Sequence, residues 1–115
     1  MKRVSVIFFS LIFIVSLGFP STPKGYLFII GGGRRPESMM KKFIELAERF
    51  RSGKIIIFPM ASSVPNETGP EQVEQMKSYG AREVEYHILN REQALNEENA
   101  KILDNVGGVF FSGGV

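Results

Sequence analysis

Two glycine runs are the most chemically suggestive features of this 115-residue sequence. Residues 31–33 follow the apolar stretch GYLFII, and Gly113 and Gly114 follow GVFFS at the other end of the chain. Backbone N–H groups in such runs can approach a ligand closely, as in sites for a phosphate or for the oxyanion of acyl transfer. A tight turn from a strand into a helix often needs glycine as well. Residues 31–33 are therefore compatible with both a binding loop and a structural turn.

The segment GGGRRPE does not match the common nucleotide-binding motifs. Its glycines are adjacent, and Pro36 stands at the sixth position, where a dinucleotide-binding fingerprint has glycine. The Gly-Lys-Ser/Thr of a Walker A loop is absent. Arg34 and Arg35 could instead hold a carboxylate, because a guanidinium binds one through two parallel hydrogen bonds.

The side chains that could act in acid–base or nucleophilic catalysis are few. His87 is the only histidine and Asp104 the only aspartate, which is too few for a metal cluster, and there is no cysteine. His87 falls inside an expected strand beside two glutamates, so we interpret it as a surface histidine. The serines that follow expected strands lack the G-x-S-x-G frame of a nucleophile elbow. These serines are Ser62, Ser63 and Ser112.

The first 18 residues, MKRVSVIFFSLIFIVSLG, have the pattern of a secretory signal. Lys2 and Arg3 precede an apolar run that is short for a membrane span, and small residues stand at both ends of Ser-Leu-Gly. An uncleaved membrane anchor is the alternative, and a buried core helix the last choice. We therefore expect an exported protein. The chain without this leader has twelve basic and twelve acidic residues, so it offers no basic patch for nucleic acid.

The rest of the chain alternates expected strands and helices after a linker at residues 19–24. Continuous apolar runs favour strands buried on both faces, whereas the alternation in REVEYHIL favours a strand at a sheet edge. Such alternation predicts an α/β fold with a parallel sheet and right-handed crossovers. We expect four strands, at residues 25–30, 54–60, 82–89 and 106–111, and three helices, at residues 37–51, 70–81 and 90–103.

The expected spatial order of these strands is third, second, first, fourth. It places the half-polar third strand outermost and the topological switch between the first and fourth strands. Ligands bind at such a switch, beyond the carboxyl ends of the strands. The two glycine runs should therefore face each other across one crevice.

Several segments taken together resemble the cyanophycinase-like serine peptidases, peptidase family S51. They are FIIGGG, IIIFPMASS, Tyr79-Gly80-Ala81, Arg91-Glu92 and GVFFSGG, spread over residues 25–115. The resemblance implies the class I glutamine amidotransferase-like fold, a three-layer α/β/α sandwich, here incomplete. It also implies a hydrolase without a cofactor, which cleaves aspartyl peptide or isopeptide bonds.

The same resemblance implies that the catalytic serine and histidine lie beyond Val115. Family members carry the nucleophile in a G-x-S-A-G elbow on the strand after GVFFSGG, with a histidine and an acidic residue further on. The sequence contains none of these, so we expect an amino-terminal part that is inactive alone. Val115 itself departs from the family pattern, because many relatives have an acidic or polar residue at that position. This departure bears on the choice of substrate.

The site residues that the resemblance places within the sequence are few. Gly113 or Gly114 corresponds to the oxyanion hole, and Gly32, Gly33 and Arg34 are candidates for substrate binding. A related domain that binds without catalysis is the alternative, and a nucleotide-binding Rossmann-type domain ranks below it.

Overall fold

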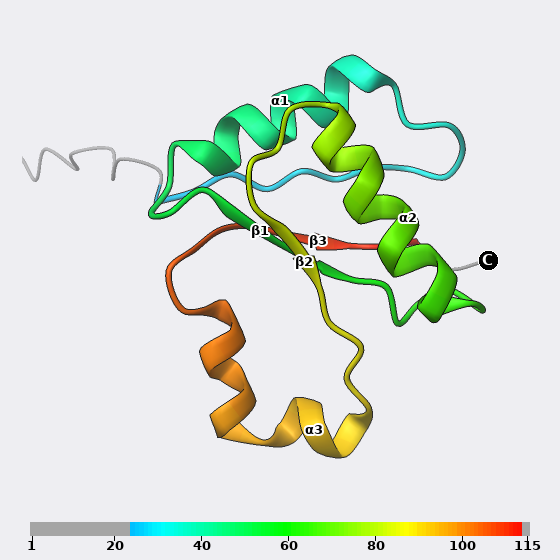
Figure 1. Ribbon diagram of the computed structural model, residues 1–115, viewed down its shortest axis with the longest axis vertical. Helices are drawn as coiled ribbons and strands as arrows, with labels where there is room; N and C mark the ends of the chain where they lie inside the picture. Colours follow the sequence, from blue (N-terminus) through cyan, green and yellow to red (C-terminus); the bar gives the residue numbers. More distant parts are fainter. Residues whose placement is uncertain (1–23, 114–115) are drawn as a thin grey trace, which may run out of the picture.

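A computed structural model describes residues 24–113, which form a small α/β domain (Figure 1). The expected signal at residues 1–18, most of the linker, Gly114 and Val115 lie outside the described residues. The predicted class is confirmed, because helices alternate with strands and the sheet is parallel.

The sheet has three strands in the order β2-β1-β3. They are β1 (Lys54–Phe58), β2 (Val84–Tyr86) and β3 (Val106–Phe111). β1 pairs in parallel with both neighbours, so Ile57 lies opposite Tyr86 on one side and Phe110 on the other. The three isoleucines of β1 are fully buried, as expected of a continuous apolar run in the centre of a parallel sheet.

Two helices cover one face of the sheet, α1 (Glu37–Glu48) and α2 (Pro65–Ser78) (Figure 1). Met40, Ile44 and Ala47 of α1 follow helical spacing and join Ile55 and Ile57 in the core. Burial of this apolar face is the main source of stability, because each fully buried aliphatic side chain contributes about 1.5–3 kcal/mol.

α2 begins earlier than the sequence pattern indicated. The turn-forming residues before Pro70 are helical, and Pro65 lies in the first turn, where its missing N–H costs nothing. The helix ends at Ser78, slightly before the expected boundary at residue 81. Gly80 adopts φ +102°, and the N–H of Ala81 donates to the carbonyl of Met76 at 3.0 Å.

The expected third helix is divided into two short pieces, α3 (Arg91–Leu95) and the 3₁₀ helix η1 (Glu97–Leu103). A capping box begins α3: the N–H of Gln93 donates to the side chain of Asn90, and the N–H of Asn90 donates to the side chain of Gln93. Asn96 caps the second piece through the N–H of Glu98. Neither piece buries a side chain fully, although both lie beside the sheet face opposite α1 and α2 (Figure 1). No helix within residues 24–113 is long and apolar enough to cross a membrane.

The prediction that residues 25–30 form a buried strand of the sheet is wrong, and so is the strand order built on it. β1 pairs directly with β3, and residues 26–30 lie outside the sheet. β3, the strand that lies beside β1 at this place, packs closely against the end of α1. A Cβ atom at Gly107 of β3 would be 2.3 Å from the carbonyl oxygen of Ala47. Adjacent glycines in β3 permit this approach, whereas large side chains occupy all of residues 26–30.

Candidate functional site

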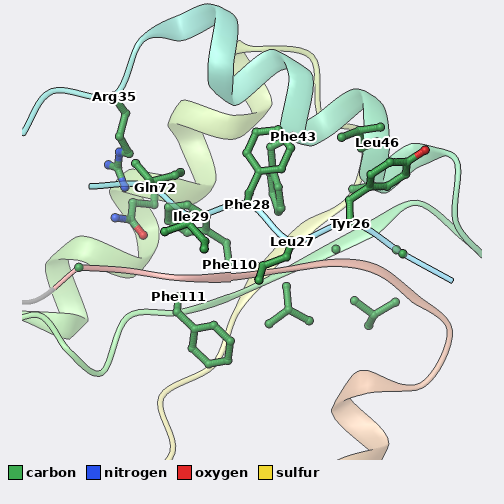
Figure 2. Close-up of a pocket in the computed structure, with 18 of the residues that line it drawn as sticks. Tyr26, Leu27, Phe28, Ile29, Arg35, Phe43, Leu46, Gln72, Phe110 and Phe111 are labelled. Atoms are coloured by element: carbon green, nitrogen blue, oxygen red, sulfur yellow. The ribbon is translucent and has the colours of Figure 1, made fainter. Parts of the chain in front are cut away.

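A cleft of about 1250 Å³ is bordered by residues 24–35, α1 and β3 (Figure 2). One wall is the segment at residues 26–30, and the opposite wall is β3 together with the side of α1 that carries Phe43 and Ala47. β3 is at the edge of the sheet, so one side of its backbone has no strand partner among the described residues.

The side chains of the detached segment alternate in their contacts, as the side chains of a strand do. The ring of Tyr26 lies 5.8 Å from that of Phe50, and the ring of Phe28 lies 6.1 Å from that of Phe43. Leu27 and Ile29, between them, are 84% and 85% exposed. The segment is therefore held to α1 by alternate side chains, while its other face is open.

The two glycine runs line this same cleft. Residues 31–33 form one border and Gly113 another, beyond the carboxyl end of β3. A Cβ atom added to Gly31, Gly32 or Gly113 would meet nothing within 4 Å. Gly33 adopts φ +102°, a conformation that suits glycine. The structure thus brings Gly32, Gly33 and Gly113 to one open site, and Gly114 lies outside the described residues.

A buried polar pair lies at the carboxyl end of β3, and one of its members, Gln72, lines the cleft. The Ser112 hydroxyl donates to the side-chain carbonyl of Gln72, and both side chains are buried. Because the Gln72 oxygen is engaged and the residue lines the cleft, its amide NH₂ is left as a donor. The Arg35 guanidinium lies above the ring of Phe110, 5.4 Å from its centroid (Figure 2). This end of the cleft is therefore rich in hydrogen-bond donors.

Gln72 was missed in the sequence because it falls in an ordinary helical segment. The available signal was a polar residue on the apolar face that Val73 and Met76 share. Such a position suggests a buried polar side chain that needs a partner. The partner, Ser112, is 40 residues away along the chain and becomes apparent only in the fold.

The charges around the cleft are all positive. Its lining includes Lys24, Arg34, Arg35 and Arg51, and no aspartate or glutamate. None of these four cations forms a salt bridge within residues 24–113. By contrast, six other cations of the described chain do so. They are Lys41, Lys42, Arg49, Lys54, Lys77 and Arg82.

The remaining titratable candidates lie elsewhere. The Nε2 atom of His87 is 3.3 Å from the Glu85 carboxylate, next to β2 and away from the cleft lining. A hydrogen bond from Lys54 lowers the pKa of Glu85 below its usual value; burial opposes this shift, and a hydrogen bond from His87 adds to it. Asp104 ends η1 and is exposed. These groups form a surface charge cluster and a helix end, with no nucleophile beside them.

The candidate serines are also separated from the histidine. Ser62 bonds to the Thr68 hydroxyl at 2.7 Å, Ser63 is exposed, and Ser112 is buried against Gln72. No serine in the described part of the chain bonds to His87. The described residues thus contain open N–H donors and cations but no assembled nucleophile and base.

The nucleophile and histidine expected beyond Val115 stay a prediction. Val115 and Gly114 both lie outside the described residues, so the cleft is described only as far as Gly113. Within that limit, the oxyanion-hole candidate that the structure places at the cleft is Gly113.

No protein-family model and no curated protein matches the chain. Residues 24–113 also bring together no group of three histidine or carboxylate side chains that could hold a metal ion.

Proposed function

We propose that this chain is the amino-terminal part of a serine-type hydrolase of the cyanophycinase family. It would cleave aspartyl peptide or isopeptide bonds, with the nucleophilic serine and the histidine carried beyond Val115. The observation that carries the proposal is that Gly113 and residues 31–33 border one cleft with nothing packed above them. Packing gives no reason for glycine at Gly31, Gly32 and Gly113, whereas close approach of a substrate does.

The proposed chemistry is acyl transfer. A serine oxygen attacks the carbonyl carbon, the C–N bond breaks, and the departing amine takes up a proton; water then hydrolyses the acyl-enzyme. The oxygen of the tetrahedral intermediate becomes negative and needs preorganised N–H donors. In this proposal the N–H of Gly113 or Gly114 donates to that oxyanion. Gly32, Gly33 and Arg34 hold the aspartyl end of the substrate.

The finer fold assignment belongs to the same proposal. A class I glutamine amidotransferase-like domain has helices on both faces of a mostly parallel sheet. α1 and α2 supply one layer, and the partial cover by α3 and η1 fits the start of the other (Figure 1). The leader at residues 1–18 would direct the protein out of the cell, or anchor it if uncleaved, and the partner would be an aspartyl peptide.

A binding domain without catalysis is the second candidate. The observation in its favour is that Ser112, the serine nearest the glycine run, has its hydroxyl buried against Gln72. A cleft with donors and no accessible nucleophile can bind a carboxylate without cleaving it.

A matched pair of substitutions at Gly113 tests the proposed hydrolase. The natural polypeptide that carries these residues is assayed for release of the amino acid from an aspartyl dipeptide. Gly113→Pro removes the N–H, and Gly113→Ala keeps it in a position with free space. We expect kcat to fall roughly 10²–10³-fold for proline and to stay within about threefold for alanine. Equal losses in both variants, or no activity in the parent, would contradict the proposal.

A further inference from the structure

We infer that Gln72 of α2 is a positioning residue, which acts through the buried hydroxyl of Ser112 to hold the N–H of Gly113 in place for the oxyanion. The use of this N–H rests on the proposed function. The way in which the N–H is held rests on the contacts of Gln72 and Ser112, and it can be measured without any hydrolysis.

Gly113 has no contact of its own that would hold it among the described residues. A Cβ atom there would meet nothing within 4 Å, and no backbone hydrogen bond joins Gly113 to another residue in the range 24–113. Glycine also has the least restricted backbone of all residues. An oxyanion donor, however, must point in a fixed direction before the negative charge develops. Ser112 must therefore set this direction, because it shares a planar peptide group with Gly113.

Ser112 is held from two sides. Its N–H donates to the carbonyl of Phe58 at 3.1 Å, which continues the parallel pairing of β1 with β3. Its hydroxyl donates to the side chain of Gln72. Ser112 is only 4% exposed, because it follows Phe110 on the face of β3 that packs against the helices. The two bonds together fix the residue whose peptide group carries the N–H of Gly113.

Gln72 is itself held firmly, because the core anchors its helix. Val73 and Met76 of α2 belong to the hydrophobic core, and the Gln72 side chain is buried beside them. Packing does not require a polar pair here, since two apolar side chains of similar shape can replace a buried hydrogen-bonded pair at little cost. We therefore attribute the pair to control of the open glycine that follows it.

Nitrogen-15 relaxation measured on the natural polypeptide that contains residues 24–113 tests how this N–H is held. The order parameter of the Gly113 amide should be about 0.85 in the parent and should fall below about 0.6 in Ser112→Ala. The Gly107 amide, which packs against α1, should stay rigid in both and is the internal control. The double variant Gln72→Met/Ser112→Ala should unfold at nearly the parent's urea concentration and still lose the rigid Gly113 amide.

Kinetics with an aspartyl dipeptide test the consequence for catalysis. Ser112 does not line the cleft, so Ser112→Ala should leave KM unchanged. It should lower kcat roughly tenfold, which is less than the loss of a deleted oxyanion donor. Gln72→Glu keeps an acceptor oxygen for Ser112 and should restore most of kcat relative to Gln72→Met. The matched control is Gln75→Met on the same helix, where the backbone carbonyl of Gln75 accepts from Ser78; it should leave kcat unchanged.

Three results would overturn the inference. They are a Gly113 amide that is already mobile in the parent, an unchanged order parameter in both Ser112→Ala and the double variant, and an equal fall in kcat for Gln75→Met and Gln72→Met. A parent without hydrolase activity would contradict the proposed function instead. The order parameters would then still decide whether Gln72 and Ser112 hold Gly113.

Discussion

Glycine serves two different purposes in two regions of this molecule. In β3, a Cβ atom at Gly107 would be 2.3 Å from a backbone oxygen of α1, and one at Gly108 would be 2.8 Å from the Ala47 side chain. At Gly31, Gly32 and Gly113 the same atom would meet nothing. Gly107 and Gly108 are needed because β3 packs closely against α1, whereas Gly31, Gly32 and Gly113 border open space.

This difference separates a structural glycine from a candidate functional one. A packed glycine is explained by the atoms that surround it, and its substitution affects the free energy of unfolding. An open glycine without neighbours has no such explanation in the fold. Its absent side chain leaves room for a ligand, so its substitution should affect binding or catalysis instead.

The largest effect is expected in the packed pair. Gly107→Ala should lower the free energy of unfolding by about 3 kcal/mol, because backbone atoms on α1 cannot move aside cheaply. Gly32→Ala, the matched control from the open run, should change it by less than about 0.5 kcal/mol. Urea denaturation followed by circular dichroism measures both. If the two variants lose stability equally, the distinction between packed and open glycines is wrong.

A smaller effect is expected at Gly69 of α2, a packed glycine that faces a side chain. Its added Cβ atom would be 2.5 Å from the Tyr86 ring, which is 39% exposed and has room to rotate. The helix preference for alanine, about 1 kcal/mol, opposes the clash. We expect Gly69→Ala to lower the free energy of unfolding by about 1 kcal/mol.

The Tyr86→Ser background provides the control for that measurement. Without the ring, Gly69→Ala should become stabilising, because only the helix preference is left. A double-mutant cycle measured by urea denaturation gives the coupling between the two positions. An unchanged loss in the serine background would show that the ring is not the cause.

Much of the fold was predictable from local patterns. The apolar run of β1, the amphipathic face of α1, the glycine that ends α2 and the Asn90 capping box all depend on residues close together in the sequence. The alternation in REVEYHIL correctly placed β2 at the sheet edge.

The errors concern relations between distant residues. The apolar run at residues 25–30 suggests a buried strand but does not show which strand it would pair with. The close contacts of Gly107 with α1 show that β3, with its small residues, is the strand that fits beside β1. The same limit applies to the site. The glycine runs were recognisable in the sequence, but the buried pair of Gln72 and Ser112 joins segments 40 residues apart. Local sequence patterns therefore identified the glycines that border the cleft, but they missed the hydrogen bond between Gln72 and Ser112.

Covalent labelling tests the central claim most directly. The natural polypeptide that contains residues 24–113 is treated with a fluorophosphonate, which modifies activated serines, and the labelled residue is located by mass spectrometry. The account predicts one labelled serine beyond Val115, with labelling blocked by an aspartyl dipeptide. Labelling of Ser62, Ser63 or Ser112, or no labelled serine at all, would contradict it.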